Sequence, residues 1–371
     1  MDDLTLKALT TQVLWAAFTG SALFGAIAQH THFCTMGAIS DVVNMNDWTR
    51  TRMWGLAVGV AMIGFYLLAT IGLIDPAKTL YASNRLIWLS ATIGGLMFGF
   101  GMVLASGCGS KTLVRIGGGN LKSVVVFVVM SVAAFATLKG ITAVLRVSTV
   151  DRVAMEFSAN AAFPNWLANA TGMGIVSAGL ILALLLGLAL IIWALLGRDF
   201  VRFDNLLAGF GLGTLIVAMW WISGHLGYVV EHPETLQEAF LATNSGRSEA
   251  LSFVSPVAYT VDWLMFFSDK SKVLTVGIVS VFGVVVGSAI YAVATCSFRW
   301  EGFHNAEDTA NHLAGAVLMG VGGVAAMGCT VGQGLSGLST LSANSFIAVA
   351  AIVVGAVVAL KYQVWRMENT V

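Results

Sequence analysis

The chain has 371 residues, of which 57% are apolar and only 10% charged, and its formal net charge is zero. A soluble domain of ordinary composition carries about 25% charged residues, so this composition predicts an integral membrane protein. The neutral balance excludes bulk charge as the basis of partner binding, and the sequence has no basic stripe of the kind that binds nucleic acid.

Apolar stretches long enough to cross about 30 Å of hydrocarbon recur along the chain. They predict nine membrane-spanning helices in an all-α integral membrane protein embedded in the lipid bilayer. We expect residues 1–371 to form a single domain, because no stretch between the spans is long enough to bury a core of its own. The expected spans are 9–28, 53–74, 87–106, 123–145, 172–196, 205–229, 273–294, 313–328 and 343–361. We expect the segments 146–170 and 230–272 between them to be polar loops.

The distribution of lysine and arginine predicts an orientation. With nine spans and the long 230–272 segment set aside, the side that holds the N-terminus carries five of these residues and the opposite side ten. Positively charged loops are enriched on the cytoplasmic side, so we expect an external N-terminus and a cytoplasmic C-terminus.

The four cysteines share a spacing, because each has a glycine nine residues before it. The pairs are Gly25 with Cys34, Gly99 with Cys108, Gly287 with Cys296 and Gly320 with Cys329. The segment 94–108 also resembles 315–329 at a constant offset of 221. These repeats predict two pseudo-symmetric halves, at about 9–146 and about 272–364, joined by a connecting region at about 147–271.

Glycine-rich and hydroxyl-rich stretches follow the cysteines, notably 109–120 and 330–334. They favour broken helices or short re-entrant helical loops, which are tolerated at membrane depth where protein buries them or where they line a wet cavity. For the glycines upstream, such as Gly99 and Gly101, we favour close packing between helices.

Thiols suit a soft, sulfur-bearing ligand, although a membrane cysteine is by default a small apolar residue. The cysteines have no C-x-x-C or four-ligand spacing, so the pattern gives little support to a zinc or iron–sulfur site. Lys111 and Arg115 follow Cys108 at helical spacing. They would attract an anion to the mouth of a path at Cys108, or serve only as positive-inside anchors.

His30, His32 and Cys34 form an H-x-H-x-C string that could bind a soft metal in a metal transporter, although interfacial turn residues are the favoured interpretation. The sequence contains no phosphate-binding loop, nucleophile elbow or dinucleotide fingerprint in the required context. We therefore expect no cofactor and no enzymatic activity.

Three motifs resemble the YeeE/YedE family of sulfur transport membrane proteins. They are 33–37, 107–110 with the glycines 117–119, and 328–334. The resemblance implies nine membrane helices plus short helical loops that dip into the bilayer, in two pseudo-symmetric halves. It also implies uptake of thiosulfate across the bacterial inner membrane, along a path lined by the thiols that map to Cys34, Cys108 and Cys329.

The resemblance also implies a TusA-like sulfur carrier as a cytoplasmic partner, and it leaves a selenium-compound transporter as an alternative. A second alternative is a membrane thiol oxidoreductase or sulfurtransferase, in which Cys34 and Cys108, or Cys296 and Cys329, cycle between thiol and disulfide. Residues expected to support the path are Cys296, Thr35, Ser110, Lys111, Arg115, Thr330 and Gln333.

Overall fold

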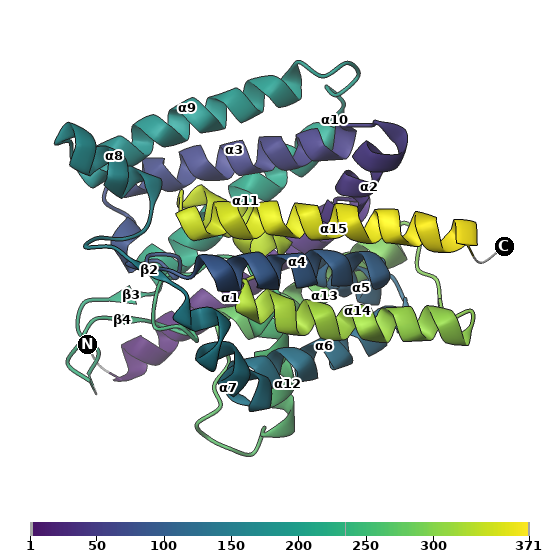
Figure 1. The fold of residues 1–371 in the computed structure, drawn as a ribbon. Coiled ribbons are helices and arrows are strands. Elements are labelled where there is room, and N and C mark those ends of the chain that lie inside the picture. Colours follow the sequence, from purple (N-terminus) through teal and green to yellow (C-terminus); the bar gives the residue numbers. More distant parts are fainter. Residues whose placement is uncertain (1–2, 234, 370–371) are drawn as a thin grey trace.

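The computed structural model describes residues 3–233 and 235–369 as a bundle of helices with two short antiparallel ladders (Figure 1). The α-helices are α1 (Asp3–His30), α2 (Thr35–Met45), α3 (Thr49–Thr70), α4 (Trp88–Leu104), α5 (Gly109–Gly117), α6 (Leu121–Lys139), α7 (Ile141–Ser148), α8 (Phe163–Thr171), α9 (Ile175–Leu195), α10 (Phe203–Leu206), α11 (Leu212–Trp221), α12 (Ser255–Met265), α13 (Val276–Ala294), α14 (Ala306–Ala325) and α15 (Ala343–Asn369). The 3₁₀-helices are η1 (Pro76–Lys78) and η2 (Val150–Arg152), and the π-helices are η3 (Leu207–Gly211), η4 (Ile222–Leu226) and η5 (Gly332–Gly337). Strand β1 (Arg85–Leu86) pairs with β2 (Met155–Glu156), and β3 (Tyr228–Val229) pairs with β4 (Ala239–Phe240).

The long apolar helices confirm the predicted fold class of an all-α integral membrane protein. Eight helical stretches among the described residues are long and apolar enough to cross a membrane, and they coincide with eight of the nine expected spans. These stretches are Leu4–Met45, Thr49–Thr70, Trp88–Gly117, Leu121–Lys139, Ile175–Leu195, Phe203–Leu226, Val276–Ala294 and Ala343–Asn369. The remaining expected span, 313–328, falls on α14, whose first turns carry the polar residues Asp308, Asn311 and His312.

Side chains cap several of these helices. The Asn120 carboxamide accepts the backbone N–H of Ser123 at 2.9 Å at the start of α6. Asn305 accepts the N–H of Asp308 at 2.7 Å at the start of α14. Such caps satisfy backbone donors that the first helical turn leaves unpaired.

Glycines bring the central helices into backbone contact, which confirms the packing interpretation. A Cβ atom at Gly99 of α4 would lie 2.1 Å from the Ile352 carbonyl oxygen of α15. At Gly101 it would lie 2.7 Å from the Gly315 carbonyl oxygen of α14. Gly25 plays the same part where α1 meets α13. Small residues at membrane helix interfaces permit this approach.

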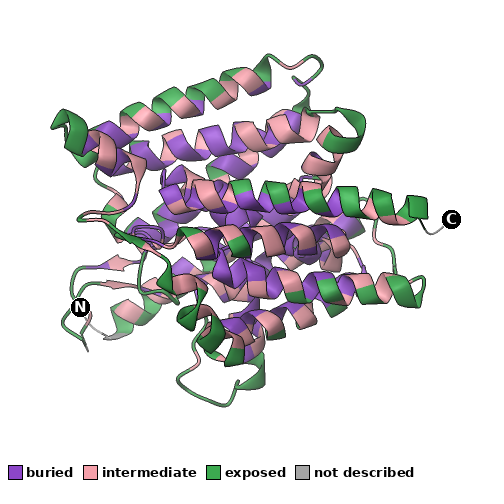
Figure 2. Ribbon diagram, viewed as in Figure 1, coloured by how far each residue is buried: buried purple, intermediate pink, exposed green. Residues whose placement is uncertain are grey.

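Buried residues concentrate along these central helices, whereas α9 and the helix ends are more exposed (Figure 2). The segment 230–272 departs from the expected polar loop, because its second half enters the core. Leu251, Phe253 and Val254 are fully buried, and the Phe253 ring lies 5.8 Å from that of Phe24 on α1. Expecting a loop throughout was wrong because an apolar run too short to span the membrane can still insert between helices that do.

Candidate functional site

Three helices end four residues before a cysteine, and a new helical segment begins directly after that cysteine. Cys34 lies between α1 and α2, Cys108 between α4 and α5, and Cys329 between α14 and the helical segment 330–339 that contains η5. In each case the cysteine carbonyl accepts the backbone N–H four residues further on, at 3.0, 2.9 and 2.7 Å. Each thiol therefore lies at the N-terminal end of a helical segment, where the helix dipole is positive and backbone donors are free.

Two of the thiols face backbone donors directly. The Sγ atom of Cys34 lies 3.5 Å from the N–H of Gly37, and that of Cys329 lies 3.3 Å from the N–H of Gly332. The backbone amide of Phe253 also faces the sulfur of Cys329. The buried segment 250–258 thus contributes to this site.

Cys108 occupies the middle position. It lies within electrostatic range of both Cys34 and Cys329, and its Sγ atom is 3.2 Å from the hydroxyl of Ser110. All three thiols are buried and none forms a disulfide. The structure therefore brings together the three cysteines that the sequence selected.

Basic side chains gather at the Cys34 end of the row. Lys111 and Arg115, both half-buried on α5, lie within electrostatic range of Cys34, and Lys111 also lies near Cys108 and Arg50. Lys111 and Arg115 near one buried thiol produce a positive local potential, whereas Arg50 pairs with Asp41 at 3.4 Å. Such a potential suits an anionic ligand.

Several polar atoms near the thiols have no hydrogen-bond partner among the described residues. They are the hydroxyls of Thr35 and Thr330, the indole nitrogen of Trp54 and the side-chain oxygen of Gln333. Thr35, Trp54 and Thr330 line a largely apolar cavity of about 360 Å³. The amide nitrogen of Gln333 donates to the Ala326 carbonyl at 2.7 Å. Because buried polar groups are nearly always paired, these unpaired atoms are available to a ligand or to water.

The structure separates Cys296 from the other cysteines. Cys296 is exposed, with φ of +53°, and its N–H makes the same helix-closing hydrogen bond as those of Ser106 and Met327. Those two residues lie two positions before Cys108 and Cys329. The position equivalent to a path thiol is therefore Phe298, so the shared glycine spacing does not reflect a shared place in the fold.

The histidine string is not gathered around Cys34. The ring of His30 contacts the Tyr291 hydroxyl at 2.6 Å and the Asp204 carboxylate at 3.0 Å, whereas His32 is exposed. In the described part of the chain, no group of three or more His, Cys, Asp or Glu side chains is placed to hold a metal.

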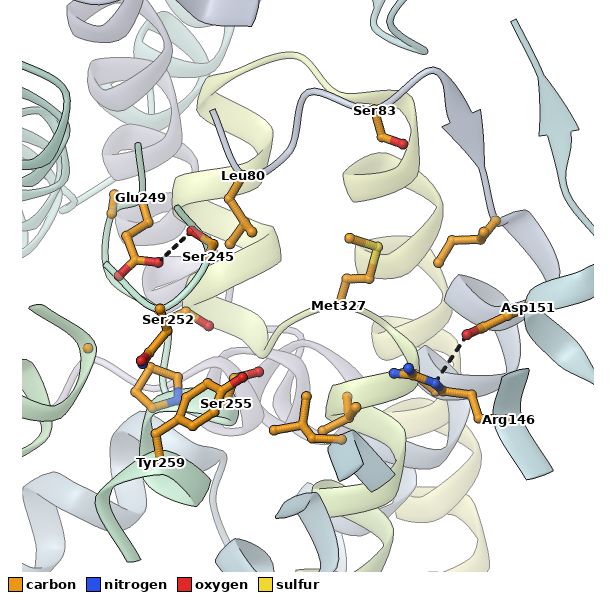
Figure 3. A pocket seen from close by; sticks show the side chains of 18 of the residues that line it. Leu80, Ser83, Arg146, Asp151, Ser245, Glu249, Ser252, Ser255, Tyr259 and Met327 are labelled. Carbon is orange, nitrogen blue, oxygen red and sulfur yellow. Dashed lines mark hydrogen bonds and ion pairs between the residues drawn. The ribbon is translucent and has the colours of Figure 1, made fainter. Parts of the chain in front are cut away.

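A cavity of about 460 Å³ lies near the segments that carry Cys329 and Phe253 (Figure 3). Met327, two residues before Cys329, and Ser252, directly before Phe253, line it. We call this cavity the vestibule. Its lining includes Arg85 of β1 and Asp151 of η2, which precedes β2, so it lies at the end of the bundle where β2 is labelled in Figure 1.

Charged side chains lie on opposite walls of the vestibule. Arg146 of α7 pairs with Asp151 of η2 at 3.1 Å on one wall, where Arg85 also lies, and Glu249 faces Ser245 on the other wall (Figure 3). Sequence reasoning did not select these residues, since no motif marks them. The available signal was a single glutamate immediately before the apolar run 250–254.

The sequence is similar to those of known transport proteins. A family model described as sulphur transport matches residues 30–358. The chain is 26% identical over 343 residues to the thiosulfate transporter TsuA of Escherichia coli strain K12, with 90% of each chain covered. It is also 26% identical over 344 residues to the thiosulfate transporter TsuA of Spirochaeta thermophila, with 91% of this chain and 94% of the relative covered.

Proposed function

The chain belongs to the sulphur transport family, and on that premise we propose that it carries thiosulfate across the membrane along a path lined by Cys34, Cys108 and Cys329. The names of the two TsuA relatives support the substrate. The observation that carries the path is the row of three buried thiols at helical N-termini, with Cys108 in the middle.

The chemistry of the row suits this anion. Thiosulfate carries two negative charges, and removing its water is costly unless other donors replace that water. Backbone N–H groups at the start of a helical segment bind anions, and thiol S–H groups are weak donors beside a polarisable sulfur. The Ser110 hydroxyl lies 3.2 Å from the thiol of Cys108 and supplies a further donor.

The remaining supporting residues have distinct roles in this proposal. Lys111 and Arg115 offset the negative charge of the anion near Cys34, and the unpaired hydroxyls of Thr35 and Thr330 donate as it passes. The carboxamide of Gln333 holds the helix break around Cys329 through the hydrogen bond that it donates to the Ala326 carbonyl. Cys296, exposed and outside the row, has no part in the path.

We further propose that the protein lies in the bacterial inner membrane with its N-terminus external, in two pseudo-symmetric halves. The vestibule is then the external mouth of the path, and Lys111 and Arg115 lie toward the cytoplasm. A TusA-like carrier on that side would accept the sulfur that the path delivers.

The test is thiosulfate-dependent growth of a strain that lacks other thiosulfate uptake, complemented with single-cysteine variants. Cys34→Ala, Cys108→Ala and Cys329→Ala are expected to abolish growth, because each removes a thiol from the row. Cys296→Ala is the matched control and is expected to support growth like the natural protein. Full growth with Cys108→Ala or Cys329→Ala, at equal protein levels in the membrane, would remove these thiols from the path.

Two further measurements separate the alternatives. Radiolabelled thiosulfate uptake into vesicles, with selenite and sulfate as competitors, distinguishes a sulfur transporter from a selenium transporter. Mass spectrometry after exposure to substrate distinguishes transport from sulfurtransferase chemistry. Transport through hydrogen bonds leaves the thiols unmodified. In a sulfurtransferase, a cysteine thiolate would attack the outer sulfur of thiosulfate, break its S–S bond, release sulfite and be left as a persulfide.

A further inference from the structure

We propose that Glu249 sets the charge of the vestibule and thereby makes thiosulfate uptake depend on pH: the neutral carboxylic acid admits the dianion, and the carboxylate repels it. This inference rests on the proposed function, because it concerns the same substrate and the mouth of the same path. Glu249 would thus control entry of the anion, and it lies in the segment between the membrane-spanning helices Phe203–Leu226 and Val276–Ala294.

The chain fixes Glu249 at the vestibule wall from two sides. The Ser245 hydroxyl donates to Oε2 of Glu249 at 3.2 Å, and the backbone N–H of Glu249 donates to the Ser223 hydroxyl of η4 at 2.9 Å. The next residues, 250–254, enter the core and end at the amide that faces Cys329. The carboxyl group is therefore held at the wall of the vestibule, and the chain runs from there to the amide that faces Cys329.

The groups packed around Glu249 do not neutralise a carboxylate there. Tyr81 approaches from the segment after η1 and Tyr259 from α12, and both are neutral phenols in ordinary conditions. The guanidinium of Arg247, in the same segment, donates a hydrogen bond to the Ala82 carbonyl and not to Glu249. No ion pair joins Glu249 to a lysine, arginine or histidine in the described part of the chain.

Beyond Tyr259, Lys272 pairs with the carboxylate of Asp262 at 2.5 Å. This lysine is therefore already neutralised by another acid. The nearest cations that also line the vestibule are Arg85 and Arg146 on the opposite wall.

One proton on Glu249 changes the net charge of the vestibule lining. Four of its described lining residues carry formal charge, namely Arg85, Arg146, Asp151 and Glu249. With Glu249 ionised, the two cations and two anions cancel. With Glu249 neutral, the lining carries one net positive charge. The guanidinium groups that would attract an oxyanion there are Arg146, which also pairs with Asp151 at 3.1 Å, and Arg85, which also lies 3.9 Å from the Glu156 carboxylate outside the lining.

The titration of Glu249 falls in the physiological range. Burial raises the pKa of this carboxyl from its ordinary value to about 7, although the hydrogen bonds from Ser245 and from the Asn244 backbone oppose the shift. Thiosulfate keeps both charges across this range, so a change in uptake near neutral pH reports on the protein.

The experiment uses the full chain in proteoliposomes, with radiolabelled thiosulfate, equal pH on both sides and a clamped membrane potential. The initial uptake rate is expected to fall about tenfold between about pH 6 and about pH 8, as the neutral fraction of a group with a pKa near 7 does. Glu249→Gln, a neutral side chain of the same shape, is expected to keep the rate of the acidic condition across the range.

Two further variants sharpen the test. Glu231→Gln removes an exposed glutamate of the same segment outside the vestibule, and it is expected to follow the natural protein. Ser245→Ala removes a hydrogen bond that favours the carboxylate, so the midpoint of the pH profile is expected to rise. The raised midpoint in Ser245→Ala would support the proposal even if Glu249→Gln failed to fold.

Each outcome decides the proposal. Loss of pH dependence in Glu249→Gln, or the raised midpoint in Ser245→Ala, supports it. An unchanged pH profile in folded Glu249→Gln, or no uptake by that variant at any pH, overturns it and leaves the thiosulfate function standing. No thiosulfate uptake by the natural protein at any pH would refute the proposed function itself.

Discussion

Replacing Gly99 by alanine is expected to force α4 away from α15. The added Cβ would lie 2.1 Å from the carbonyl oxygen of Ile352 and 2.9 Å from the backbone nitrogen of Ala356. Carbon and oxygen atoms cannot approach so closely, and the obstructing atoms belong to a helix backbone that no rotamer change can move. Overpacking of this kind costs about 1–3 kcal/mol.

The expected result is a Tm lower by about 1–4 °C for the detergent-solubilised protein, the range that this cost implies for a chain of 371 residues. Thiosulfate uptake is expected to fall as well, because α4 carries the break that positions Cys108. Gly302→Ala is the matched control, since a Cβ there would meet no atom within 4 Å.

A pair of double variants tests the physical reason for this loss. Gly64→Ala would also clash, but with the Val217 side chain at 2.3 Å, so adding Val217→Ala is expected to restore the Tm. Adding Ile352→Ala to Gly99→Ala is expected to restore nothing, because the clash is with the carbonyl. An unchanged Tm in Gly99→Ala, or full rescue by Ile352→Ala, would refute backbone contact between α4 and α15.

Three other outcomes follow from the structure. Cys296 is expected to react with a water-soluble maleimide before the three buried cysteines, as measured by peptide mass spectrometry; faster labelling of Cys108 would contradict its burial. Asn120→Ala is expected to lower the free energy of unfolding by about 1 kcal/mol or more, because it removes the α6 cap and the hydrogen bond that the Asn120 amide donates to Glu301 at 2.6 Å. Asn120→Asp keeps the cap acceptor but sets a second carboxylate against Glu301, so it is not expected to restore that stability. Because the folded-state pKa of Glu249 is raised to about 7, the folded state gains protons relative to the unfolded state between the ordinary glutamate value and 7. Its stabilising contribution is therefore lost as pH rises through about 7, and the Tm of the natural protein is expected to fall over that range more than the Tm of Glu249→Gln does.

The sequence predicted the membrane class and eight of the spans because both depend on composition over about 20 residues. It also selected Cys34, Cys108 and Cys329 through local motifs, and the structure places these three together. Motifs and composition are properties of contiguous residues, so they can be recognised in the sequence without knowledge of the three-dimensional structure.

The fourth cysteine shows where spacing fails as a guide. Cys296 matches the others in its distance from a glycine, but it ends α13 in the left-handed residue rather than two positions later. A displacement of two residues along a helix break moves a side chain from the protein interior to its surface. A count of residues from a glycine does not record where the helix ends.

The vestibule was beyond the reach of the sequence for a different reason. Arg85, Arg146, Asp151 and Glu249 come from four separate segments, and only the packing of the bundle places them around one cavity. The same packing draws 250–254 into the core, where hydropathy alone predicted a loop. Single charged residues that are far apart in the chain form no motif or periodic pattern in the sequence, even where the fold brings them together.

The helix breaks before Cys108 and Cys329 also limit which substitutions can stabilise the protein without harming activity. Ser106 and Met327 adopt a left-handed backbone with φ of +57° and +58°, a conformation that costs a non-glycine residue about 1–2 kcal/mol. Glycine at either position would recover that energy and would be a natural choice in a thermostabilisation screen. It would also loosen the turn that holds the following thiol in place. A variant selected only for heat resistance is thus at risk of losing activity.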